Sequence, residues 1–157
     1  MPKTVLLMFI AKKIGLLKPL LIIFVFYGMI RNFSRGIHAK TPLGCWVVGT
    51  VNYLAMAYLS VVITVPKKVY DALYICCFCV YLKYAPSGTE VNPVYKDQVV
   101  TMKIISLLLV VVYYFIGTIK TGLLRNIALL SLISQAIHII PLTYKISNQK
   151  GGVIYEE

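Results

Sequence analysis

Residues 43–68 read LGCWVVGTVNYLAMAYLSVVITVPKK, and this stretch decides the fold. Leu43 to Val65 carry no charged side chain, and an apolar run of roughly 20 residues is the length that crosses a bilayer as a helix. Pro66 then ends the run beside Lys67 and Lys68. The stretch therefore predicts a transmembrane helix that is closed by a tight basic turn.

The whole chain has the composition of a membrane protein. Of its 157 residues, 59% are hydrophobic and only 13% are charged, and the mean hydropathy is +0.82. A soluble domain of this size needs far more polar surface to cover its core. Because the bilayer core holds no water, each apolar run must be helical to satisfy its own backbone. We therefore expect an all-α integral membrane helical bundle that forms a single transmembrane domain over residues 1–157.

The order of the apolar runs predicts two transmembrane hairpins, which give four spans. The first hairpin covers residues 43–84 and the second covers residues 99–144, and a short basic turn closes each of them. A loop at 85–98, broken by proline and glycine, joins the two hairpins. Residues 145–157 form a polar tail, which we expect to be mobile.

The N-terminal segment, residues 1–42, is basic and has two interpretations. Residues 14–30 form either a short fifth span or part of an interfacial helix. Lys and Arg divide eight to eight between the two sides of the membrane if 14–30 crosses, and twelve to four if it does not. The positive-inside rule favours the second arrangement, with four spans and both termini on the positive side. The five-span arrangement stays open.

Positive charge gathers at the ends of the apolar runs. The chain has 16 Lys and Arg against five Asp and Glu, which gives a net charge of +11. Basic residues at the ends of spans are typical of contact with anionic headgroups. We therefore expect anionic phospholipids as partners and no nucleic acid. The residues assigned to headgroups are Lys12, Lys13, Arg31, Arg35, Lys67, Lys68, Lys120 and Arg125.

Each predicted span also has a narrow polar face. Small and hydrogen-bonding residues that recur at helical spacing are the residues that helix contacts in membranes use. These faces predict helix packing within the bundle and against other membrane subunits of a larger complex. The residues on them are Asn52, Ser60, Tyr74, Tyr81, Ser106, Tyr113, Ser131, Ser134 and Gln135.

His138 is the sharpest candidate for a cofactor site. An ionisable group in a membrane helix can ligate haem, hydrogen-bond a quinone or move protons. A neutral histidine that packs between helices or faces lipid near the membrane surface is the simpler interpretation, and we favour it. The only other histidine, His38, lies in a basic loop. We expect no bound cofactor.

The four cysteines are interpreted as small hydrophobic packing residues. Three of them, Cys76, Cys77 and Cys79, crowd one apolar run and cannot form a spaced disulfide framework. The fourth, Cys45, stands at the start of the clearest span. No histidine lies at metal-ligand spacing from them, so we expect no metal site.

No catalytic motif is apparent along the chain. It has no phosphate-binding glycine loop, no zinc-spaced set and no nucleophile elbow, and none of its five acids lies inside a long span. The sequence therefore predicts a non-enzymatic structural or accessory subunit of a multi-protein membrane complex, of respiratory or ATP-synthase type. We expect it in the mitochondrial inner membrane, with the endoplasmic reticulum as the alternative. The competing hypotheses are a small channel or transporter subunit, and a haem- or quinone-binding anchor that uses His138.

Overall fold

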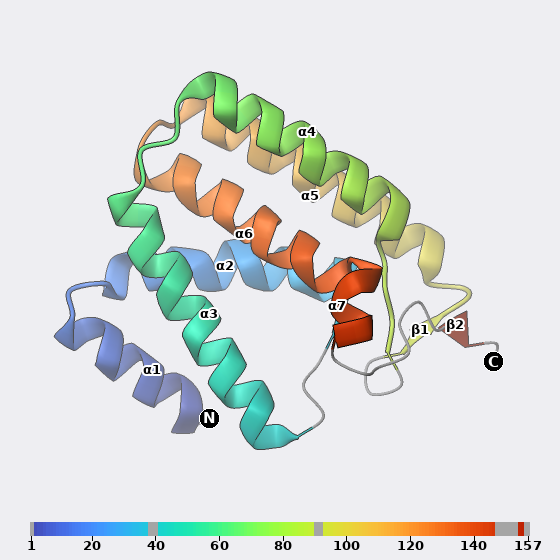
Figure 1. The fold of residues 1–157 in the computed structure, drawn as a ribbon, viewed down its shortest axis with the longest axis horizontal. Coiled ribbons are helices and arrows are strands. Elements are labelled where there is room, and N and C mark those ends of the chain that lie inside the picture. The colour runs from blue at the N-terminus through green and yellow to red at the C-terminus, as the bar shows by residue number, and fades with distance from the viewer. Residues whose placement is uncertain (1, 38–40, 90–92, 147–153, 156–157) are drawn as a thin grey trace.

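The computed structural model describes residues 2–37, 41–89, 93–146 and 154–155. Its elements in chain order are α1 (Pro2–Lys13), α2 (Leu17–Ser34), α3 (Pro42–Val62), α4 (Lys67–Tyr84), β1 (Val94–Tyr95), α5 (Val99–Ile119), α6 (Leu123–Ile139), α7 (Pro141–Ile146) and β2 (Ile154–Tyr155) (Figure 1). The chain is 81% helical, and the prediction of an all-α membrane helical bundle is confirmed.

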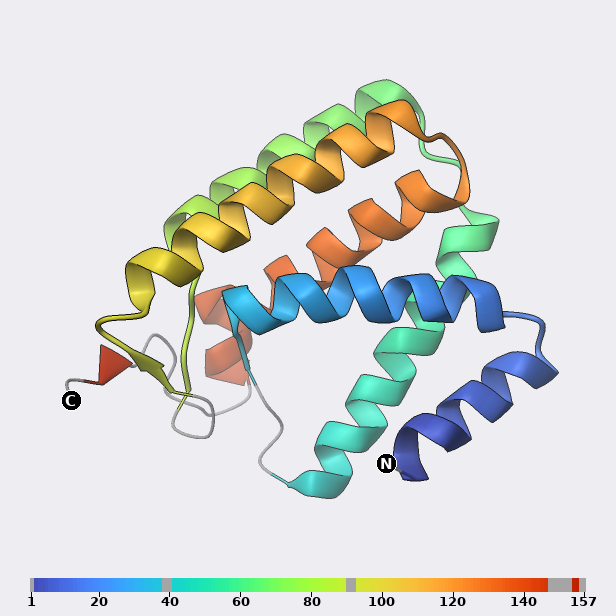
Figure 2. The ribbon, with the colours of Figure 1, turned by 180° about the vertical axis from the view of Figure 1, so that it is seen from behind.

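Helix α2 lies on one face of the bundle and packs against α3, α5 and α6 (Figure 2). Its buried residues Leu20, Ile23, Tyr27 and Ile30 recur every three or four positions, which places them on one face of the helix. This packing, and a length and composition sufficient to cross a membrane, favour the short fifth helix over the interfacial placement that positive charge favoured. The short fifth helix is the interpretation that the structure supports.

A break at Gly15 separates α1 from α2. Lys12 and Lys13 end α1, and Gly15 then has a φ of 75°, a left-handed conformation that glycine adopts without steric cost. Helix α1 turns back and packs on α2 and α3 through Leu7 and Ala11, which are buried.

The two helical hairpins close at the predicted basic turns. Helix α3 begins at its N-cap Thr41, whose hydroxyl accepts a hydrogen bond from the amide of Gly44 at 3.1 Å. It ends before Pro66, and α4 follows. Gly122, with a φ of 73°, joins α5 to α6. Pro141 has no amide hydrogen, so the run 123–144 makes two helices, α6 and α7, in place of one.

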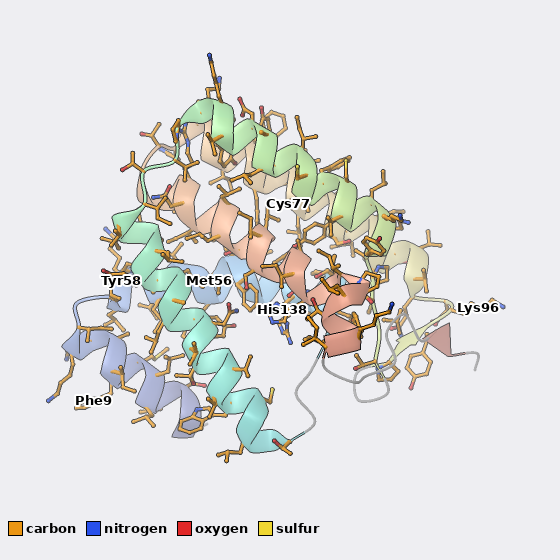
Figure 3. All side chains as sticks on the ribbon, in the orientation of Figure 1. Phe9, Met56, Tyr58, Cys77, Lys96 and His138 are labelled. Atoms are coloured by element: carbon orange, nitrogen blue, oxygen red, sulfur yellow. The ribbon has the colours of Figure 1, made fainter. Side chains whose placement is uncertain are left out.

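Three helical stretches are long and apolar enough to cross a membrane: Leu17–Ser34, Leu43–Val62 and Val99–Ile119. Helix α6 is apolar but shorter, and α4 has the length but carries four charged residues. Phe9 and Tyr58 project from the outer faces of α1 and α3, whereas Met56 and Cys77 are buried between helices (Figure 3). The outer surface is thus apolar, as contact with lipid requires.

The predicted mobile tail lies mostly outside the described residues. Its first two residues, Lys145 and Ile146, complete α7. Farther along, Ile154 and Tyr155 form β2, which pairs in parallel with β1 in the connection between α4 and α5.

Buried tyrosines tie the helices together through main-chain oxygens. The hydroxyl of Tyr81 on α4 donates to the carbonyl of Leu132 on α6 at 3.2 Å. The hydroxyl of Tyr113 on α5 donates to the carbonyl of Phe26 on α2 at 2.6 Å. The ring of Tyr74 packs against the ring of Tyr114, with centroids 4.4 Å apart. Polar faces predicted from helical spacing are therefore buried between helices here.

The contact of Gly117 with Tyr70 makes a stability prediction. The Tyr70 hydroxyl donates to the carbonyl of Tyr113 at 3.1 Å, and a Cβ at position 117 would lie 2.7 Å from Cζ of Tyr70 and closer still to its hydroxyl. We expect Gly117→Ala to displace that ring and lower the free energy of unfolding by about 1–3 kcal/mol. Gly28→Ala is the control, because a Cβ there meets nothing within 4 Å. Unfolding in mixed detergent micelles, followed by circular dichroism, measures both; equal stability of the two variants would contradict the expectation.

Candidate active site

A buried carboxamide organises one end of the bundle. Gln135 on α6 is fully buried, and its Oε1 accepts a hydrogen bond from Nη1 of Arg31 on α2 at 3.2 Å. Its Nε2 donates to the hydroxyl of Ser34 at 2.8 Å and also to the carbonyl of Arg35. One side chain thus binds the last turn of α2 and the first residue after it.

Arg31 reinforces the same connection. Its Nη2 donates to the carbonyl of Ile37 at 2.9 Å, and its Nη1 also donates to the hydroxyl of Tyr27 at 3.2 Å. Both terminal nitrogens of Arg31 therefore bond to groups of the protein, although the side chain is only partly buried. Its assignment to lipid headgroups stays a prediction.

The backbone that leaves α2 is held from two further sides. The amide of Gly36 donates to the carbonyl of Ser87 at 2.8 Å, and the amide of Ile37 donates to the carbonyl of His138 at 3.2 Å. Gly36 has a φ of 123°, and a Cβ there would lie 3.0 Å from the His138 carbonyl oxygen. The chain is thus fixed up to Ile37, and it is described again from Thr41.

Cys45 lies in the first turn of α3, just beyond this connection. Its thiol is exposed, and it lines a cavity of 150 Å³ together with residues of α1, α2 and α3. The apolar walls of that cavity include Leu7, Phe24, Trp46 and Tyr53. The indole nitrogen of Trp46 is buried and has no hydrogen-bond partner among the described residues. Reactive cysteines in proteins sit in such places, at helix N-termini and partly accessible.

The other three cysteines lie in the middle of α4. Cys77 is buried in the core, and Cys76 and Cys79 are exposed on the outer side of the same helix. The exposed residues around them are large and apolar, such as Ile75 and Leu82. These thiols are therefore placed for packing and lipid contact.

His138 closes α6 beside the fixed connection. Its Nδ1 lies 2.6 Å from the carbonyl oxygen of Ser134, and its ring centroid is 6.4 Å from that of Tyr27. No group of three His, Cys, Asp or Glu side chains that could hold a metal occurs within the described part of the chain. Binding of a cofactor by His138 stays a prediction.

The remaining residues of the predicted polar faces lie between helices or bond along their own helix. The hydroxyl of Ser134 donates to Oδ1 of Asn52 on α3 at 3.0 Å. Ser60 and Ser106 donate to carbonyls one turn back, those of Ala57 and Lys103. The Ser131 hydroxyl is buried and finds no hydrogen-bond partner among the residues described here.

The other residues assigned to headgroups divide into two groups. Lys12, Lys13, Lys67, Lys68 and Lys120 are exposed, and Arg35 is partly buried. Arg125 turns inward: its Nε donates to the carbonyl of Gly117 at 2.7 Å, and its guanidinium lies 5.5 Å from the centroid of the Tyr70 ring.

Removal of the buried carboxamide tests the network. We expect Gln135→Leu to lower the free energy of unfolding by about 1–3 kcal/mol, because donors of Arg31 and an acceptor of Arg35 would be left unpaired. Ser131→Ala is the matched control on the same helix, since it removes a buried hydroxyl that has no partner in the described residues; its stability should be unchanged or higher. Chemical unfolding in micelles measures both, and a Gln135→Leu variant as stable as the parent would contradict this account.

Comparison with known proteins places the chain in a family. The family model described as "Accessory gene regulator B" matches residues 1–140. A putative AgrB-like protein of Clostridium acetobutylicum is 26% identical, over 98% of this chain and 75% of its own length. The accessory gene regulator protein B of Staphylococcus haemolyticus is 23% identical, over 76% of this chain and 64% of its own length. Protein FsrB of Enterococcus faecalis is 28% identical, over 82% of this chain and 54% of its own length. No solved structure matches.

These matches overturn the functional prediction. The family consists of membrane proteins that process a quorum-sensing peptide, and its members are cysteine peptidases. The expectation of a non-enzymatic subunit of a respiratory or ATP-synthase-type complex is therefore wrong. The mitochondrial inner membrane and the endoplasmic reticulum are wrong as well, because the relatives are bacterial and indicate the bacterial cytoplasmic membrane. With a family model that covers residues 1–140 of 157, the chain belongs to the accessory gene regulator B family.

Proposed function

We propose that this chain is a membrane-embedded cysteine peptidase that processes a quorum-sensing peptide precursor, with Cys45 as its nucleophile and His38 as its base. One observation carries the proposal. In a chain of this peptidase family, Cys45 is the one described cysteine that lies in the first turn of a helix, exposed beside a cavity, and His38 precedes it by seven residues.

The position of each cysteine favours Cys45 over the other three. A thiolate attacks a peptide bond, so the nucleophile needs a place where the anion is stabilised and a base can reach it. The middle of a membrane helix offers neither water nor free amide groups, which excludes the environment of Cys76 and Cys79. The start of α3 places Cys45 at the positive end of the helix dipole, and its thiol is exposed there.

The choice of His38 as the base follows from the connection that carries it. His38 itself lies outside the described residues, but its two flanks are fixed: Ile37 by Arg31 and His138, and Thr41 by its capping contact with α3. A base must lie within hydrogen-bond reach of the nucleophile in the reactive complex. A histidine on a short connection with fixed ends, joined directly to the helix of Cys45, fits that requirement.

The proposed reaction uses only the Cys45 thiol, the His38 imidazole and water. His38 takes the proton of the Cys45 thiol, and the sulfur attacks the carbonyl carbon of the scissile peptide bond. The C–N bond then breaks, and His38 returns the proton to the leaving amine, which leaves the acyl group on Cys45 as a thioester. Attack by water releases the carboxylic acid and restores the thiol.

The sequence alone predicts that Cys45 is a packing residue like the other three cysteines. The signals that distinguish it are local: Thr41 and Pro42 mark a helix start, which puts Cys45 in the first turn, and a histidine stands seven residues earlier. Neither signal alone is specific, because a lone Cys–His pair occurs in many proteins.

Replacement of the cysteines tests the nucleophile. We expect Cys45→Ala to lower the rate of precursor cleavage in proteoliposomes by a factor on the order of 10⁴ or more. A chain with Cys76→Ser, Cys77→Ala and Cys79→Ser should keep activity within about fivefold of the parent, since these thiols have only packing roles. Mass spectrometry of the peptide products gives both rates. If the triple variant lost cleavage and the Cys45→Ala variant retained it, the assignment of Cys45 as the nucleophile would be wrong.

The two histidines provide a paired test of the base. Iodoacetamide alkylates thiolates, so labelling of Cys45 in the membrane reports on its activation. We expect His38→Ala to slow cleavage by roughly 10²–10⁴-fold and also to slow the labelling of Cys45. His138→Ala should leave the labelling rate near that of the parent. The opposite pattern would make His138 the base.

A further inference from the structure

The opposite end of the bundle, where the basic turns lie, contains two adjoining cavities. One has a volume of 400 Å³ and lies between the end of α3 and the start of α6. The other has a volume of 280 Å³ and lies between α4 and α6. Both are lined by Ile63, Thr64, Val65 and Asn126, so the two cavities adjoin along this shared wall, and we refer to them together as the groove.

The deeper part of this groove is apolar. Val69 and Leu73 of α4 form one wall, and Leu130 and Ile133 of α6 form the other. Val69 is 47% exposed and Leu73 is 37% exposed, so neither is covered by the rest of the described chain. An apolar groove on the outer side of a membrane bundle fits a hydrocarbon chain.

The outer part of the groove combines polar and apolar residues and lies beside positively charged turns. It is lined by Thr64, Thr121, Gly122 and Arg125. The turns that form it also carry the exposed side chains of Lys67, Lys68 and Lys120. Nε of Arg125 is the atom that bonds to Gly117, and this contact holds the guanidinium at the cavity wall.

Two helices also point their N-termini toward this end. The N-caps of α4 and α6 are Pro66 and Gly122, and neither helix has a side-chain cap or an acidic residue in its first turn. The nearest acid on these helices, Asp71, accepts a hydrogen bond from Tyr114 of α5 at 3.3 Å and does not line either cavity. Uncapped helix N-termini add positive potential to that of the four basic side chains.

We propose that this groove binds one anionic phospholipid. The acyl chain lies between α4 and α6, and the phosphodiester lies in the outer part of the groove near Arg125 and the lysines of the two turns. The observations that favour a lipid over a free anion are the apolar cavity directly beside the basic turns and the position of both at the end of the membrane helices. This site lies at the other end of α3 from Cys45, and it does not depend on the proposed peptidase function.

A tryptophan reporter with brominated lipids tests the proposal. The chain has a single tryptophan, so Trp46→Phe gives a silent background in which Leu73→Trp reports on the groove. Ile104→Trp, at an exposed position of α5 that is 54% accessible, reports on bulk lipid. Each full-length reporter is placed in vesicles that contain dibrominated phosphatidylglycerol or dibrominated phosphatidylcholine, and fluorescence quenching is measured against the mole fraction of each.

The expected result is lipid selectivity at one reporter only. At position 73, half-maximal quenching should need roughly fivefold less phosphatidylglycerol than phosphatidylcholine, since one basic residue near the membrane surface contributes about that factor. At position 104, the two lipids should quench alike. Lys67→Gln, Lys68→Gln and Lys120→Gln together should abolish the preference at position 73, whereas Lys83→Gln, Lys103→Gln and Lys145→Gln, which remove the same charge elsewhere, should not.

Two results would overturn the proposal: equal preference at positions 73 and 104, or a preference at 73 that survives the loss of the three lysines. Glycerol phosphate is also added to vesicles that contain no brominated lipid. If it changes the fluorescence at position 73, and phosphatidylglycerol is not preferred there, the groove binds free phosphate and the lipid assignment fails. Val69→Trp serves as a second reporter on the same wall, so that misfolding of the Leu73→Trp chain leaves the test intact.

Discussion

The carboxamide of Gln135 is the constraint on which one whole end of the molecule depends. A polar group buried away from water must find its partners within the protein. Gln135 does so with Arg31, Ser34 and the carbonyl of Arg35, and each of these bonds joins α6 to the end of α2. Arg31 in turn holds the carbonyl of Ile37. The route by which the chain leaves α2, as far as Ile37, is therefore set by hydrogen bonds, in a region where apolar packing alone would leave it free.

Helix α6 also forms hydrogen bonds that position other parts of the bundle along its length. Near its start, Nδ2 of Asn126 donates to the carbonyls of Ser60 and Ile63 and so fixes the last turn of α3. Farther along, Ser134 bonds to Asn52 in the middle of α3. Polar side chains of one helix thus position α3 at two levels, and Gln135 positions the connection that precedes it. Because each hydrogen bond in a membrane contributes only about 1 kcal/mol, the precision comes from several of them acting on one helix.

Much of the fold follows from sequence, because apolar runs and helical spacing are local properties. The polar faces of α3, α5 and α6 could be read from residues three or four apart. For helix α2, the count of lysines and arginines favoured an interfacial placement, because such a count does not include the contacts of Leu20, Ile23 and Tyr27 with three other helices. The hydrogen bond of Arg31 to Gln135 could not be predicted, because the two residues are 104 positions apart. The family was missed for a similar reason: two residues, His38 and Cys45, make no motif that chemistry alone would single out.

Peptide hydrolysis needs water and proton transfer, and the interior of a bundle of membrane helices excludes both. The position proposed for the nucleophile, Cys45, is consistent with this requirement. In the first turn of α3, the thiol stands where the helix begins, exposed beside a cavity. The cavity next to it runs between α1, α2 and α3 and has apolar walls, so an apolar stretch of a peptide can lie there while its scissile bond stays at the accessible end. The same thiol one or two turns deeper would face lipid, as Cys76 and Cys79 do on α4. The boundary position is therefore a condition of the proposed chemistry, and the hydrogen bonds around Gln135 are what hold the chain there.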